Sequence, residues 1–276
     1  MTRKAEEELK TPFSYFGYEP ESEEEKRFLN DYNPEKWKKA SHTADVAVFA
    51  LSETGLELLL VKRGGFPYKG HYCLPGGFIN MDESLYETAA RELEEETGLS
   101  GIPIFQVGSF GRPGRDPRDR NITTLYTTIL NKEDLHAKAG DDAADTDWVL
   151  LTDVDEQVIE SGDTAESYFT LKLEGKNVFT PEIRTEIHSG RYRTEKKEIT
   201  DTSSLAFDHA LEIAEAYRFI KKEILTSYAG INVLGETFRI SALKKLLKAV
   251  LLEPVDDSML SLMPVRKNSD GSYTYI

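Results

Sequence analysis

The sequence is poor in cysteine and has no long hydrophobic run. Cys73 is the single cysteine among 276 residues, which excludes an intrachain disulfide. We expect it to be a buried strand residue rather than a nucleophile. No apolar run approaches the roughly 20 residues that cross a bilayer, and the charged start "MTRKAEEELK" lacks the apolar core of a signal peptide. These features predict a cytoplasmic protein that does not use a membrane.

Cations are scarce as well. Lysine and arginine number 34 against 49 acids, a net charge of −15, so the general electrostatic signature of a nucleic-acid-binding protein is missing. The negative charge is unevenly distributed along the chain, because residues 205–276 carry nine cations and nine acids. The first 204 residues therefore hold the whole excess. This shift predicts two regions with different roles, and it argues against DNA as a partner.

Hydrophobic periodicity predicts the elements. A capped helix over 83–97, a long amphipathic helix over 205–225 and a second over 239–252 are indicated, followed by a hairpin that turns at Asp270-Gly271. Residues 160–200 favour two or three β segments without an evident role. Further strands are predicted at 44–51, 56–63, 71–79, 102–110, 122–130 and 146–151.

The segment "GGFINMDESLYETAARELEEETGLS" gathers seven carboxylates and one arginine. Ser84 and Glu87 have the spacing of a capping box, and Gly98 is a natural helix stop. Three further glutamates stand at i, i+3 and i+4, so they project from one face of the helix: Glu92, Glu95 and Glu96. Carboxylates this close raise each other's pKa unless a cation neutralises them. Oxygen ligands without His or Cys select Mg²⁺ or Mn²⁺.

These residues resemble a complete Nudix box. Gly77, Glu83 and the run Arg91-Glu92-Leu93-Glu94-Glu95-Glu96-Thr97-Gly98-Leu99 fill every fixed position of that motif. The resemblance implies metal-dependent hydrolysis of a nucleoside diphosphate linked to another group. It assigns the metals to Glu92, Glu95 and Glu96, with the Gly76 carbonyl as a further ligand. Arg91 would orient the glutamates, and Glu83 would support the loop or a second metal.

The resemblance also implies an architecture. We expect an α+β fold in which a Nudix α/β/α sandwich with a mixed sheet precedes a small winged-helix-like C-terminal domain. The expected domains are an N-terminal arm at 1–40, the Nudix domain at 41–204 with a β excursion at about 155–200, and the C-terminal domain at 205–276. A homodimer is expected from the same resemblance alone.

A loop rich in arginine, "GRPGRDPRDRNIT", bears on the substrate. Arginines suit phosphate contacts, although a solvated loop paired with nearby acids would look the same. Together with "AGDDAADTDW" and "LAFDHALEIA", the loop is similar to the ADP-ribose branch of the family, in particular to its two-domain members. That similarity implies substrate-facing or dimer-facing arginines. The substrate-binding candidates are Arg63, Arg115, Arg118 and Arg120, and Arg112 belongs to the same cluster.

Several assignments stay open in the sequence. The general base is Asp141, Asp142 or Glu92. His209 either lines the site or is a structural residue, and we favour the second. Phe66, Tyr68 and Tyr72 either stack on adenine or pack in the core.

Two functions compete. One is a hydrolase that converts ADP-ribose to AMP and ribose 5-phosphate. The other resembles the Nudix-related transcriptional regulators of NAD metabolism, which bind ADP-ribose-like ligands and DNA. Retention of all three box glutamates favours the enzyme, and the acidic balance opposes a DNA-reading helix.

Overall fold

The structure, a computed structural model, describes residues 20–135, 145–227 and 230–276. The chain divides into two compact units, Met1–Ala40 and Ser41–Ile276. In the first unit, helix α1 (Glu23–Asp31) begins where the Ser22 side chain accepts a hydrogen bond from the backbone of Glu25, and the 3₁₀ turn η2 (Pro34–Lys36) follows. No described helix is both long and apolar enough to traverse a bilayer.

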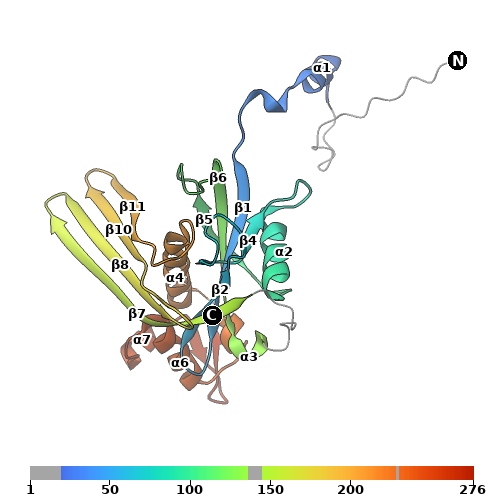
Figure 1. The fold of residues 1–276 in the computed structure, drawn as a ribbon. Coiled ribbons are helices and arrows are strands. Elements are labelled where there is room, and N and C mark those ends of the chain that lie inside the picture. Colours follow the sequence, from blue (N-terminus) through green and yellow to red (C-terminus); the bar gives the residue numbers. More distant parts are fainter. Residues whose placement is uncertain (1–19, 136–144, 228–229) are drawn as a thin grey trace. The chain divides into compact units, whose positions relative to one another are not determined.

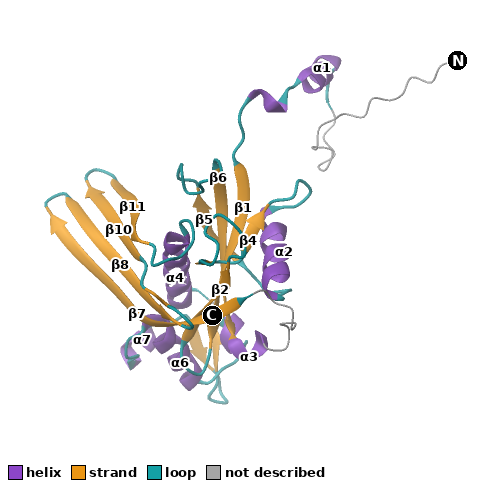
Figure 2. Ribbon diagram, viewed as in Figure 1, coloured by secondary structure: helices purple, strands orange, loops and turns teal. Residues whose placement is uncertain are grey.

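The second unit is built on one mixed sheet, drawn in orange in Figure 2. Its strand order is β11-β10-β8-β7-β2-β1-β6-β5. β1 and β6 run parallel over their whole length, and the other pairs are antiparallel. The strands are β1 (Ser41–Leu51), β2 (Leu56–Lys62), β3 (Tyr72–Cys73), β4 (Gly76–Phe78), β5 (Phe105–Phe110), β6 (Asn121–Asn131), β7 (Thr146–Ser161), β8 (Thr164–Glu174), β9 (Val178–Phe179), β10 (Glu182–Ser189) and β11 (Arg193–Asp201).

Helices cover both faces of this sheet, because alternate residues of a strand point to opposite sides. On β1, Val46 and Val48 pack in a cluster with Leu93 of helix α2 (Leu85–Thr97). The intervening Ala47 and Phe49 belong to the larger cluster, which includes helices α4 (His209–Thr226) and α6 (Ile240–Leu251). The predicted α/β/α sandwich around a mixed sheet is therefore confirmed, and Figure 1 shows α2 and α4 flanking the strands.

The C-terminal residues form the predicted helical region. After α4 come the short helix α5 (Ile231–Leu234), then α6, the short helix α7 (Asp257–Ser261) and a hairpin of β12 (Val265–Lys267) and β13 (Tyr273–Tyr275). α4 and α6 share their core with the sheet, and Tyr217 of α4 donates a hydrogen bond to the Val250 carbonyl of α6. The boundary at residue 205 and the winged-helix description remain predictions.

Two strand predictions differ in detail from the structure. The segment 71–79 is divided, because Pro75 has no N–H to donate and β3 and β4 pair with different strands. The strand predicted at 146–151 continues as β7 to Ser161, since pairing with β8 extends it beyond the core. β8, β10 and β11 complete this excursion, and Figure 1 shows its two hairpins extending away from α4. The short helix α3 (Lys132–Leu135) follows β6.

Candidate functional site

Helix α2 carries its acidic residues in a fixed orientation. The Ser84 side chain accepts from the Glu87 backbone and the Glu87 side chain accepts from the Ser84 backbone, so the predicted capping box is present. Gly98 ends the helix in the left-handed conformation with φ 72°. Ala89 and Leu93 are buried against the sheet. The face that bears Glu92, Glu95 and Glu96 is thereby turned toward β4.

Arg91 holds the outer part of this face together. Its guanidinium donates to Glu83 at 2.7 Å, to Glu92 at 2.7 Å and to Glu95 at 3.1 Å. It also donates to the Phe78 carbonyl of β4. Hydrogen bonds from Arg91, and next from Asn80, lower the pKa of Glu83 to about 2. The roles that the resemblance implies, orientation of the glutamates by Arg91 and support of the loop by Glu83, remain predictions.

Glu96 lies apart from Arg91 and faces the interior. Its carboxylate accepts a hydrogen bond from the Gly76 backbone N–H at 3.0 Å. Burial raises the pKa of Glu96 to about 7, and the negative charges of Glu92 and Asp45 act in the same direction. The two glycines of β4 are needed for different contacts. A Cβ atom on Gly77 would collide with the Glu92 carboxylate, and one on Gly76 would collide with Ala44 and Asp45 of β1. Gly77 therefore lets β4 approach α2, and Gly76 lets it approach β1.

A cavity of about 410 Å³, here called the box pocket, opens beside Glu96. β1, the start of the β2–β3 loop, β4 and the β5–β6 loop form its walls. Among the predicted substrate contacts, Arg63, Arg115 and Arg118 line it together with Gly76. Arg120 is not among its lining residues, and its side chain donates to the Asn121 carbonyl instead.

Aromatic rings hold two of these arginines. The Arg63 guanidinium lies 4.7 Å from the centre of the Phe207 ring, and Arg118 lies 5.6 Å from the same ring. Arg118 also pairs with Asp116 at 2.7 Å, with 44 % of the Arg118 side chain exposed. A polar ligand in the box pocket can therefore reach cationic hydrogen-bond donors on Arg63 and Arg118.

Arg115 is engaged by helix α4. It donates to Asp208 through two nitrogens, at 2.7 and 2.9 Å, and to Glu212 at 2.5 Å. Only 5 % of its side chain is exposed, and Glu212 is fully buried. The two carboxylates raise the pKa of Arg115, and burial opposes them. Arg115 thus ties the β5–β6 loop to α4, while its predicted substrate contact remains a prediction.

Sequence reasoning missed two acids beside the box pocket. Asp45 of β1 accepts a hydrogen bond from Thr123, and its charge acts on Glu96, His209 and Glu212. Its position as the one acid within the apolar run "ADVAVFAL" was the sequence feature that could have identified it. Burial raises the pKa of Glu212, a carboxyl on the apolar face of an amphipathic helix.

The structure places His209 and two other residues for which the sequence allowed alternative roles. The His209 ring is buried, lines the box pocket and accepts from the Leu74 backbone N–H at 3.3 Å through Nδ1, so it has a structural bond as well as access to the pocket. Burial lowers its pKa. Tyr72 is core, packed on Phe179, and Cys73 is a buried strand residue. Asp141 and Asp142 lie outside the described residues.

The side chains on this face of α2 offer the type of ligand atom that a hard divalent cation prefers. All are oxygens, Glu96 is buried against a single backbone N–H, and the Glu92 charge disfavours its ionised form. A divalent cation would relieve this repulsion. Within the part of the chain that the structure describes, no three such groups are already arranged around one point, because Arg91 engages Glu92 and Glu95.

Comparison with known proteins identifies the family. The NUDIX domain matches residues 41–170. An ADP-ribose pyrophosphatase of Methanocaldococcus jannaschii is 35% identical over 129 residues, which cover 47% of this chain and 75% of that protein. The ADPR responsive transcriptional repressor NtrR of Acinetobacter baylyi is 36% identical over 109 residues, 39% of this chain and 44% of the repressor, so the chain matches less than half the repressor's length.

The fold extends this similarity beyond the matched domain. The crystal structure of a MutT/nudix family protein from Enterococcus faecalis superposes with a TM-score of 0.66 at 24% identity. The superposition covers 95% of this chain and 96% of that one, including the C-terminal helical region. With the box residues in place on α2 and a pyrophosphatase relative covered over three quarters of its length, the chain belongs to the Nudix family.

Proposed function

We propose that this chain is a metal-dependent hydrolase that cleaves ADP-ribose to AMP and ribose 5-phosphate. The observation that carries the reaction is Glu96, which brings a carboxyl without an ion-pair partner among the described residues to the edge of the box pocket beside Glu92. ADP-ribose as the substrate is supported by the pyrophosphatase relative from M. jannaschii.

The proposed metal ligands are Glu92, Glu95, Glu96 and the Gly76 carbonyl, with Mg²⁺ or Mn²⁺ as the ion. When bound, such an ion activates a water and neutralises phosphate oxygens. Arg91 keeps Glu92 and Glu95 oriented through its hydrogen bonds, and Glu83 holds Arg91 in turn. Glu92 remains a candidate general base, as do Asp141 and Asp142.

The substrate's diphosphate is proposed to lie in the box pocket. Arg63 and Arg118 supply donors there, and Phe207 restricts both guanidinium groups. Held cations lose less side-chain freedom when an anion binds than free ones would.

A substrate panel tests the reaction. Purified protein is incubated with ADP-ribose, NADH, dinucleoside polyphosphates and sugar nucleotides, with Mg²⁺ or with EDTA, and products are separated by ion-exchange chromatography. ADP-ribose should give AMP and ribose 5-phosphate with Mg²⁺ only. ADP-ribose among the poorest substrates would reject the substrate, and equal turnover in EDTA would reject the metal.

The second candidate is an ADP-ribose-sensing repressor, favoured by the similarity to NtrR of A. baylyi. The C-terminal region argues against it. α7, in the position of a reading helix, follows Asp256 and begins at Asp257, and Lys244 of α6 pairs with Asp257 at 3.1 Å. Carboxylates there would repel phosphates. We therefore propose a packing or dimerisation role without useful DNA affinity.

A fluorescence anisotropy titration at low salt separates the candidates. Random duplex and promoter DNA upstream of NAD-metabolism genes should bind equally and only weakly. Submicromolar, sequence-specific binding released by ADP-ribose would favour the repressor. We also propose a cytoplasmic homodimer, to be checked by cell fractionation and by light scattering, in which a monomer mass would contradict the dimer.

A further inference from the structure

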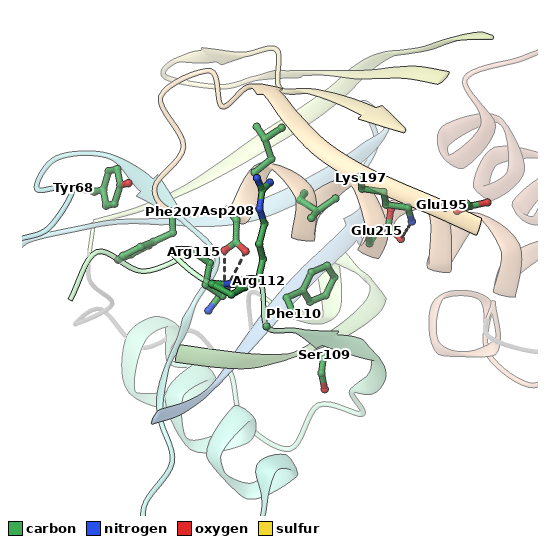
Figure 3. A pocket seen from close by; sticks show the side chains of 15 residues that line it. Tyr68, Ser109, Phe110, Arg112, Arg115, Glu195, Lys197, Phe207, Asp208 and Glu215 are labelled. Carbon is green, nitrogen blue, oxygen red and sulfur yellow. Dashed lines mark hydrogen bonds and ion pairs between the residues drawn. The ribbon is translucent and has the colours of Figure 1, made fainter. Parts of the chain in front are cut away.

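A second and larger cavity adjoins the box pocket. It has a volume of about 680 Å³ and is here called the outer pocket. The β5–β6 loop, strand β11 and helix α4 surround it, as Figure 3 shows. β11 contributes Glu195, Lys197 and Ile199, which lie beyond the residues that the family match covers. The outer pocket is therefore built partly from the β excursion, for which the sequence offered no role.

The two pockets share a wall. Phe207 and Arg115 line both of them. Arg115 is fixed by Asp208 and Glu212, and the Phe207 ring lies edge-on to Tyr68 with ring centres 4.8 Å apart. Both aromatic residues hold positive φ, 51° for Phe207 and 61° for Tyr68, a conformation that costs non-glycine residues about 1–2 kcal/mol. A ligand with phosphates in the box pocket can continue past this wall into the outer pocket.

The charges around the outer pocket cancel. Three cations, Arg112, Arg115 and Lys197, face three carboxylates, Glu195, Asp208 and Glu215. Such a lining does not select a phosphate. It offers acceptors for hydroxyl and amino groups and donors for ring nitrogens, which suits a neutral and polar group.

Arg112 is the cation that remains available to a ligand. Arg115 is bound by α4, and Lys197 pairs with Glu215 at 2.7 Å. Within residues 20–135, 145–227 and 230–276, no ion pair or side-chain hydrogen bond of Arg112 is found, and Figure 3 shows it extended between Asp208 on one side and Lys197 on the other. Phe110, at the base of Arg112, adds a third aromatic ring to Tyr68 and Phe207.

We propose that the outer pocket binds the purine nucleoside half of the substrate while the diphosphate lies in the box pocket. This inference rests on the proposed hydrolase function. Flat rings stack on aromatic side chains, the ribose hydroxyls and the purine amino group donate to the carboxylates, and Arg112 donates to a ring nitrogen. The β excursion would then determine which nucleoside the enzyme accepts.

Binding of the two reaction products tests the assignment without catalysis. Isothermal titration calorimetry compares AMP with ribose 5-phosphate on the wild type, Arg112→Ala and Arg191→Ala. Arg191 is exposed near the tip of the β10–β11 hairpin, outside both pockets, so its variant has the same charge change. Arg112→Ala should weaken AMP binding about tenfold, the loss of one charged hydrogen bond. It should leave ribose 5-phosphate unchanged, and Arg191→Ala should change neither ligand.

A second variant fills the cavity. Ile199→Trp places a bulky ring on β11 and should weaken AMP binding more than Arg112→Ala does, with thermal unfolding as the check on its fold. A loss confined to ribose 5-phosphate, an equal loss for both ligands, unchanged AMP binding or no AMP binding by the wild type would each overturn the assignment.

Kinetics separate this inference from the hydrolase proposal. If the wild type hydrolyses ADP-ribose and Arg112→Ala retains both its KM and its AMP affinity, the outer pocket assignment fails and the enzyme stands. If the wild type hydrolyses no ADP-ribose but AMP binding depends on Arg112, the hydrolase proposal fails and the nucleoside site stands.

Discussion

Helices α2 and α4 each carry buried acid close to the box pocket, but they neutralise it differently. On α4, Glu212 is fully buried, burial raises its pKa, and Arg115 of the β5–β6 loop binds it. On α2, Glu96 receives a single backbone N–H, and burial raises its pKa to about 7. Burial raises the pKa of both carboxyls, so the difference lies in the partner, which is an arginine for Glu212 and a backbone N–H for Glu96.

The difference indicates two roles for buried charge. A carboxylate that already has its cation joins two parts of the fold, as Glu212 joins α4 to the β5–β6 loop through Arg115. A carboxylate without a cation destabilises the fold when it is ionised, and a bound ion offsets that cost. Glu96 forms no ion pair with the described residues, and the charge of Arg63 offsets the effect of its burial only in part. It therefore belongs to the second kind, which supports the proposed metal site on α2.

The largest expected effect is on catalysis by α2. Exchange of both Glu95 and Glu96 for Gln removes two ligand charges, and each is expected to contribute about 10²-fold, so kcat should fall by about 10⁴. Steady-state rates with ADP-ribose and Mg²⁺ measure it. Glu94→Gln on the same helix is the control, because Glu94 is an exposed glutamate that is not among the proposed metal ligands. An unchanged kcat in the double variant would remove the basis for metal catalysis.

The next effect is on stability through α4. Arg115→Met leaves Glu212 and Asp208 without their cation and should lower the free energy of unfolding by about 3–5 kcal/mol, the usual cost of breaking a buried ion pair. Urea unfolding at pH 7.5 measures it. Adding Glu212→Gln should restore part of the loss. A change below about 1 kcal/mol would show that the α4 cluster is not a structural tie.

A third effect depends on pH. The pKa of Glu96 is raised from 4.5 to about 7, so the folded state binds this proton more tightly than the unfolded chain. The stability from protonated Glu96 is complete below pH 4.5 and is lost as pH rises to about 7. In EDTA at pH 8, Glu96→Gln should therefore exceed the wild type by up to about 3 kcal/mol in unfolding free energy.

The same comparison has two internal controls. The gap between wild type and Glu96→Gln should close at pH 4.5, where neither side chain is charged. Mg²⁺ at pH 8 should raise the unfolding temperature of the wild type more than that of the variant. Chemical denaturation and calorimetry give both quantities. A wild type more stable than the variant in EDTA at pH 8 would contradict the account of Glu96.

The smallest stability effect belongs to Arg118, which is partly exposed and pairs with Asp116. Arg118→Ala should change the free energy of unfolding by less than about 1 kcal/mol. If Arg118 donates to the substrate, KM for ADP-ribose should rise about tenfold. The contrast with Arg115→Met separates a ligand contact from a structural contact on one loop. An unchanged KM would leave Arg118 as a surface residue.

Much of the fold was readable from the sequence because its signals are local. The capping box, Gly98 and the buried positions of α2 lie within fifteen residues, and their periodicity depends only on helix geometry. The lengths of β3, β4 and β7 were predicted less well. Strand pairing decides where such elements end, and pairing is a property of residues far apart in the chain.

The sequence by itself determined the family and the proposed metal-binding face, because Glu92, Glu95 and Glu96 need only the spacing of one helix to share a face. Tertiary structure decided which arginines remain available. Arg115 meets Asp208 only through folding, 93 positions along the chain, and so becomes part of the core. Arg112 on the same loop forms no ion pair with the described residues and lines the outer pocket. In the sequence, Arg112 and Arg115 belong to one cluster of arginines. Folding gives them different environments, because a guanidinium is buried only where carboxylates replace its hydration.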